Sequence, residues 1–141
     1  MDYLPLVTEQ VSAGRRFVTE LAHRGQLSAA FWTRTEDDWG WMLYLVSPEI
    51  ADRDPRDFID LAHHCLIGLW NSGEVSADAL DLDRLVFISP SAPLAEAVRR
   101  ATPANYRSRT PPADGRIPGA RVVGADVPEV YLYGLPATSP A

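Results

Sequence analysis

The chain has no lysine and only one cysteine. All 13 basic residues among its 141 are arginines, and 19 acidic residues bring the formal net charge to −6. This balance argues against a protein that binds nucleic acid or an anionic membrane with its whole surface. Cys65 cannot close an internal disulfide, and the first residues, MDYLPLVTEQ, lack the basic start and apolar core of a signal peptide. We therefore expect a cytoplasmic protein.

Long apolar runs are also missing. None approaches the roughly 18 residues that a membrane-spanning helix requires, so we expect no membrane association. The chain is 46% hydrophobic and 23% charged, which is ordinary for a globular protein. At this length, residues 1–135 are expected to form a single α+β domain and residues 136–141 a frayed tail.

Apolar spacing predicts the secondary structure. Helical periodicity indicates helices over 4–24, 54–70 and 92–101, and short aromatic and β-branched runs indicate strands over 27–35, 39–47, 84–89, 120–124 and 129–135. Gly25 should end the first helix, Asp54 and Pro55 should begin the second, and Ser91 should cap the third. Residues 47–55 and the Pro- and Gly-rich 102–119 are expected to be loops. The order α-β-β-α-β-α-β-β predicts an α+β fold, an antiparallel or mixed sheet of about five strands with helices packed on it.

Two histidines and the cysteine stand side by side as His63, His64 and Cys65. Consecutive helical residues point about 100° apart, so these side chains do not face one another. Two metal ligands on one helix would need the i,i+3 or i,i+4 spacing that is absent here. Cys65 falls on the apolar stripe of its helix, which predicts a buried thiol rather than a reactive one.

The helix over 54–70 carries a second apolar stripe beside its core stripe. This second stripe is either covered by the chain itself or pressed against another subunit or partner. The first predicted hairpin adds an aromatic cluster that includes Trp32, and its residues fill either the core or a binding face. The candidate interface residues are Ile59, His63, Leu66, Ile67, Trp70, Trp39 and Trp41.

Charge is distributed unevenly along the chain. Residues 99–121 hold six arginines against one acid, Asp114, a local charge of +5, while the remainder carries −11. Arginines interleaved with an aromatic residue can hold phosphate and stack a base. The alternative is that these arginines neutralise acidic residues on the same surface. The candidate anion-binding residues are Arg99, Arg100, Tyr106, Arg107 and Arg109.

Motifs that would select a reaction are missing. The chain has no P-loop, GxGxxG, HExxH or CxxC pattern. Ser89 stands between a strand and a helix, but its surroundings read FISPSAP rather than GxSxG. We therefore expect no catalytic residues, no cofactor and no metal site. The residues favour a small protein-interaction module or accessory subunit, as a homo-oligomer or with a protein partner. A nucleic-acid or phosphate-ligand binder acting through residues 99–121 is the alternative.

Two segments resemble a family of small uncharacterised bacterial proteins. WGWMLYLVSPEIADRDP (39–55) carries the pattern W-x-L-x-x-x-S/T-P at Trp41, Leu43, Ser47 and Pro48. GRIPGARVVGADVPEVYLYGL (115–135) carries Y-x-Y-x-L at Tyr131, Tyr133 and Leu135. The resemblance covers roughly half of the chain and implies a bacterial α+β domain. That family has no established activity, so the resemblance implies no catalytic residues.

Overall fold

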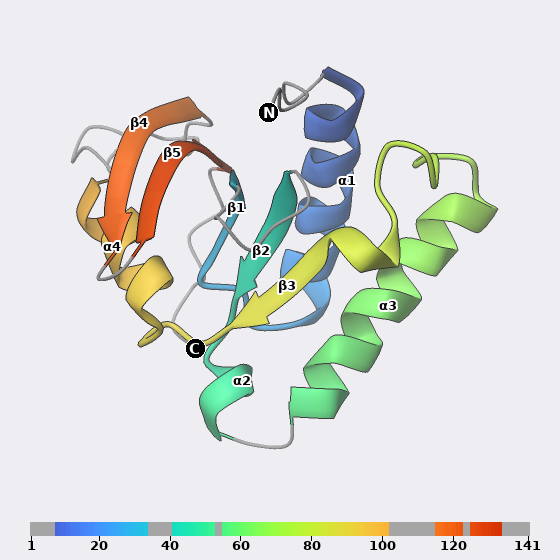
Figure 1. The fold of residues 1–141 in the computed structure, drawn as a ribbon. Coiled ribbons are helices and arrows are strands. Elements are labelled where there is room, and N and C mark those ends of the chain that lie inside the picture. The colour runs from blue at the N-terminus through green and yellow to red at the C-terminus, as the bar shows by residue number, and fades with distance from the viewer. Residues whose placement is uncertain (1–7, 34–40, 53–54, 102–114, 123–124, 134–141) are drawn as a thin grey trace.

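A mixed β-sheet forms the centre of the molecule, and helices cover both of its faces (Figure 1). The computed structural model describes residues 8–33, 41–52, 55–101, 115–122 and 125–133. In chain order the elements are α1 (Thr8–Arg24), β1 (Ala29–Thr33), β2 (Met42–Val46), α2 (Glu49–Asp52), α3 (Pro55–Asn71), the 3-10 turn η1 (Leu82–Arg84), β3 (Leu85–Ile88), α4 (Pro93–Ala101), β4 (Gly115–Val122) and β5 (Ala125–Leu132).

The sheet has the strand order β3-β2-β1-β5-β4. β1 pairs antiparallel with β2 on one side and with β5 on the other, and β4 and β5 form an antiparallel hairpin. β3 pairs with β2 in the parallel direction. The predicted α+β class and mixed sheet are therefore confirmed. The interior position of β2 accounts for its apolar residues on both faces, because each face of an inner strand is covered.

Side chains alternate between two cores, one on each face of the sheet. One core lies under α1 and α3 and takes Ala30 and Trp32 from β1 together with Leu43 and Leu45 from β2. The other core lies under α4; its buried residues are Phe31, Tyr44, Val46, Ala95, Val98 and Val130. Because successive strand residues point to opposite faces, one apolar run supplies both cores.

Local signals place the helix ends where the sequence predicts them. α1 ends at Arg24, and the Gly25 N–H donates to the Leu21 carbonyl at 2.9 Å. α3 begins at Pro55, whose fixed φ and missing N–H suit the first helical position. α1 also carries the expected Glu20–Arg24 ion pair, at 2.8 Å.

Three segments differ from the predictions. The expected loop 47–55 contains the short helix α2, whose first N–H, that of Glu49, donates to the Ser47 hydroxyl at 3.1 Å. β4 begins at Gly115 instead of residue 120, so part of the predicted loop is strand, and β5 begins at Ala125 instead of 129. Pro118 fits within β4 because that strand lies at the sheet edge, where no further strand needs its N–H. Ser91 precedes α4 by one residue and contacts the Ser89 hydroxyl at 3.0 Å.

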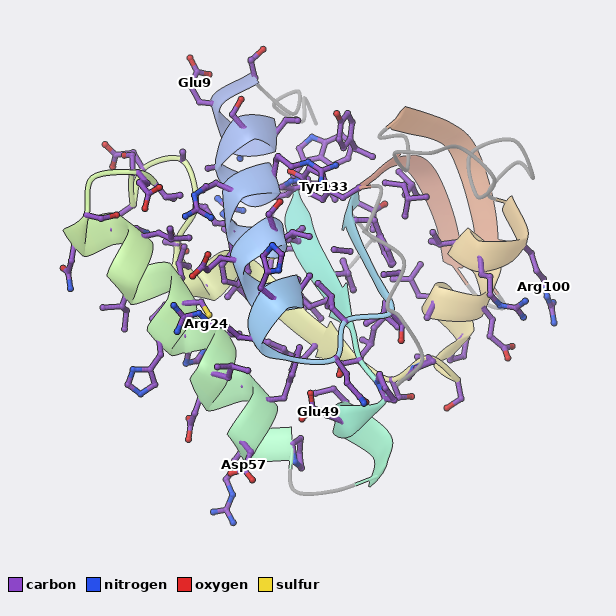
Figure 2. The ribbon with its side chains drawn as sticks, turned by 180° about the vertical axis from the view of Figure 1, so that it is seen from behind. Glu9, Arg24, Glu49, Asp57, Arg100 and Tyr133 are labelled. Carbon is purple, nitrogen blue, oxygen red and sulfur yellow. The ribbon has the colours of Figure 1, made fainter. Side chains whose placement is uncertain are left out.

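A buried hydrogen-bonded chain ties β1, α1 and the end of β5 together. The indole N–H of Trp32 donates to the Tyr133 hydroxyl at 2.7 Å, and that hydroxyl donates to the Val11 carbonyl at 2.6 Å. Figure 2 shows Tyr133 beside α1. The Tyr133 hydroxyl occupies the space that a Cβ at Gly14 would need, 2.2 Å from that position. The guanidinium carbon of Arg15 lies 5.0 Å from the centre of the Tyr133 ring.

Candidate interaction surface

Most of the second apolar stripe of α3 is covered by the chain itself. Leu66 is 0% exposed and joins Phe58, Ala62, Cys65 and Leu69 in the core. Trp41 is also a core residue, 4% exposed. This burial removes Leu66 and Trp41 from the candidate interface, because neither side chain can reach a partner. Trp39 lies outside the described residues.

Trp70 is half-buried and already has a partner within the chain. Its indole N–H donates to the Leu80 carbonyl at 3.0 Å, so the segment that follows α3 folds back over the end of the helix. A turn at Ser72 to Val75 begins this return, with the N–H groups of Glu74 and Val75 donating to the Leu69 carbonyl. Trp70 therefore holds this segment in place, and its N–H is not available to another protein.

Ile59 and His63 lie where α3 meets the end strand of the sheet. Both side chains are half-buried. The His63 ring packs edge-on against Phe87 of β3, with ring centres 6.1 Å apart, and Phe58 approaches the same ring at 6.0 Å. α3 therefore borders β3, and Figure 1 shows the two elements next to each other.

Ile67 is the exposed large hydrophobic residue of the described chain, at 39%. It follows Ile59 and His63 at successive spacings of four, so the three residues form one line along the helix. The outer edge of β3 continues this line, because no described strand pairs with β3 on the side away from β2. We call Ile59, His63, Ile67 and the outer edge of β3 the α3–β3 surface.

Neither the thiol nor the histidines form a chemical site. Cys65 is 6% exposed, and burial raises the pKa of its thiol, so it lacks the thiolate character of a reactive cysteine. His64 is exposed on α3 and does not share the direction of His63. Among the described residues, no group of three or more His, Cys, Asp or Glu could hold a metal ion. No helix in the described ranges is long and apolar enough to cross a membrane.

The arginine-rich segment is described only at its start. Arg99 and Arg100 are exposed in the last turn of α4, and Figure 2 shows Arg100 extending away from the helices on the other face. Arg100 lies 3.9 Å from Glu96, at the outer limit of an ion pair. Tyr106, Arg107 and Arg109 lie outside the described residues, so the structure does not bring the predicted anion site together.

Sequence reasoning missed the open edge of β3. The run LVFI predicts a strand but not its place in the sheet, because parallel pairing with β2 joins segments far apart in the chain. Its one readable signal is the lack of any charge or proline within the strand, since edge strands are commonly protected by such residues.

No protein family model matches the chain, nor does any curated protein or solved structure. The resemblance to small bacterial proteins therefore depends only on its quoted motifs. A function must be argued from the residues themselves.

Proposed function

We propose that this protein is a non-catalytic interaction module that docks a partner protein through the α3–β3 surface. The observation that carries the proposal is Ile67, a large apolar side chain that stays exposed on a helix whose other apolar residues the fold covers. It stands beside half-buried Ile59 and His63 and an uncharged strand edge. Apolar side chains next to open backbone groups suit a protein partner, which can cover both.

The remaining chemistry supports binding rather than catalysis. The one thiol is buried and its pKa is raised, and the described residues offer no metal-ligating cluster. The pKa values that are shifted at the surface belong to ion pairs: the hydrogen bond from Arg24 lowers that of Glu20, and Arg16 lowers that of Glu74. A reducing cytoplasm, our proposed compartment, suits a chain whose single thiol forms no disulfide.

Photo-crosslinking tests this proposal. A photoreactive amino acid at Ile67 should give a protein adduct of defined mass on irradiation in cells that make the full chain. The matched control carries the same group at His23, an exposed residue of α1 outside the α3–β3 surface. Equal adducts at both positions, or none at either, would refute the proposed docking surface. The mass of a specific adduct shows whether the partner is another copy or a different protein.

A second candidate function rests on the two exposed arginines at the end of α4. Arg99 and Arg100 could begin a phosphate-binding surface that continues into the arginine-rich residues beyond the helix. Replacing both with glutamine should weaken binding to a single-stranded oligonucleotide and reduce its salt dependence by about one unit of slope per lost phosphate contact. Arg56, exposed on α3, provides the matched control. Absence of oligonucleotide binding by the unmodified chain at low salt would exclude this function.

A further inference from the structure

The backbone of β3 offers hydrogen-bonding groups on its outer edge. The Ile88 carbonyl accepts the Ser47 N–H at 3.1 Å, so Ile88 directs its backbone groups toward β2. Because these groups alternate sides along a strand, Val86 also points to β2, whereas Leu85 and Phe87 point outward. The Leu85 N–H already donates to the Leu82 carbonyl of η1. The N–H of Phe87 and the carbonyls of Leu85 and Phe87 therefore face the open edge.

The two ends of the sheet differ in how they are protected. β4 carries Pro118, which lacks an N–H and limits pairing with another strand. β3 contains only Leu85, Val86, Phe87 and Ile88, with no charge and no proline. Three of these side chains are half-buried rather than buried, so apolar surface accompanies the open backbone groups.

We propose that the occupant of the β3 edge is a second copy of this chain, paired antiparallel through β3 so that two sheets become one. This inference rests on the proposed function and names its partner. An antiparallel strand paired with itself is isologous, so one surface serves both protomers. A two-fold axis perpendicular to the sheet keeps each face continuous, which places the two α3 helices side by side on the same face.

Charge and hydrogen bonding select the register centred on Phe87. In this register Phe87 faces the partner's Phe87, and Val86 faces the partner's Ile88. The N–H groups of Phe87 and Ser89 then both reach partner carbonyls, whereas a register centred on Val86 would ask for the Leu85 N–H that η1 already uses. The nearest charged residue, Arg84, falls opposite the partner's Pro90, so no like charges face each other across the strands.

The α3 helices supply the rest of the contact. A four-residue strand covers too little surface for a stable interface, which buries about 800 Å² on each partner. Ile59, His63 and Ile67 lie on the side of α3 that borders β3, so the two-fold axis brings them toward the same residues of the second copy. This arrangement gives Ile67 the apolar neighbour that it lacks within one chain.

Sedimentation analysis of the full chain is the first test. We expect a monomer–dimer equilibrium that Ile88→Lys weakens at least tenfold, since a lysine on an edge strand opposes pairing. Leu94→Lys is the matched control, because Leu94 is also half-buried and packs on the same core, but from α4. A monomer at every concentration, or equal weakening by both variants, would overturn the proposal.

Disulfide trapping tests the register without adding charge to the strand. In a Cys65→Ala background, Val86→Cys combined with Ile88→Cys should give a covalent dimer in a glutathione redox buffer, because opposite residues that are not hydrogen-bonded have Cα atoms about 4.5 Å apart. Either cysteine alone should not, since each faces a residue that is not cysteine. A dimer trapped by Val86→Cys alone would overturn this register. If trapping and sedimentation both fail while Ile67 still crosslinks to a different protein, the proposed function stands and the self-pairing is wrong.

Discussion

Replacing Gly14 with alanine should destabilise the protein, although alanine is the better helix former. A Cβ at Gly14 would lie 2.2 Å from the Tyr133 hydroxyl and 2.8 Å from the Trp32 indole nitrogen. Neither group can move away freely, because the hydroxyl bridges the indole N–H and the Val11 carbonyl. The added methyl group must therefore break this buried chain or push α1 away from the sheet.

The expected magnitude follows from three opposing effects. Alanine within a helix gains about 1 kcal/mol over glycine. Leaving the indole N–H of wholly buried Trp32 without its acceptor costs about 1–3 kcal/mol. Forcing a methyl group into a filled space costs about 1–3 kcal/mol more. The net loss in the free energy of unfolding is about 2–4 kcal/mol, and the melting temperature should fall by about 8–15 °C.

Gly68 provides the matched control. It also lies within a helix, but a Cβ there would meet nothing within 4 Å, so Gly68→Ala should stabilise by up to about 1 kcal/mol. Urea unfolding followed by tryptophan fluorescence measures both variants. Tyr133→Phe removes the atom nearest the new methyl group, so Gly14→Ala should cost less in that background. If Gly14→Ala and Gly68→Ala change stability alike, or the effects of Gly14→Ala and Tyr133→Phe simply add, the packing argument is wrong.

Three further predictions concern single side chains. Burial raises the pKa of Tyr133, so above pH about 10 the unfolded chain loses its proton first and the free energy of unfolding falls, by up to about 1.4 kcal/mol per pH unit. Tyr133→Phe should flatten this slope in urea unfolding between pH 8 and 11, and an unchanged slope would contradict the assignment. Cys65 should react slowly with a disulfide reagent in the folded protein and rapidly in denaturant, because burial raises its pKa; fast labelling of the native chain would show that it is accessible. Trp70→Phe should cost about 1 kcal/mol and speed proteolysis between residues 72 and 81, through loss of the bond to Leu80. A change in oligomeric state without a change in stability would instead return Trp70 to the interface.

Local signals predicted much of the fold. Pro55 and Gly25 lie at helix ends because each solves a backbone problem within a few residues of its own position. The first hairpin was also predictable, since β1 and β2 are neighbours in sequence and pair antiparallel. The core stripe of α3 followed from helical spacing, which fixes the side on which Cys65 lies.

The candidate surface was harder to predict, because periodicity shows that a side is apolar but not what covers it. Leu66 and Trp70 share the direction of Ile67 closely enough to have been grouped with it. The structure separates them through segments that arrive later in the chain: β3 beside the helix and the Leu80 carbonyl over Trp70. The Trp32–Tyr133 bond likewise joins positions 101 residues apart, a separation over which no local pattern carries information.

The inner position of β1 also has a consequence for synthesis. β1 is made early, yet one of its two neighbours, β5, is nearly the last described element to leave the ribosome. Until then one edge of β1 and the indole N–H of Trp32 await their partners. A nascent chain that ends after α4 would hold an apolar strand open on this side, in the state most exposed to aggregation or to capture by a chaperone. Completion of the fold is thus coupled to the arrival of Tyr133, and the rate of translation through residues 102–133 sets how long that exposed state lasts.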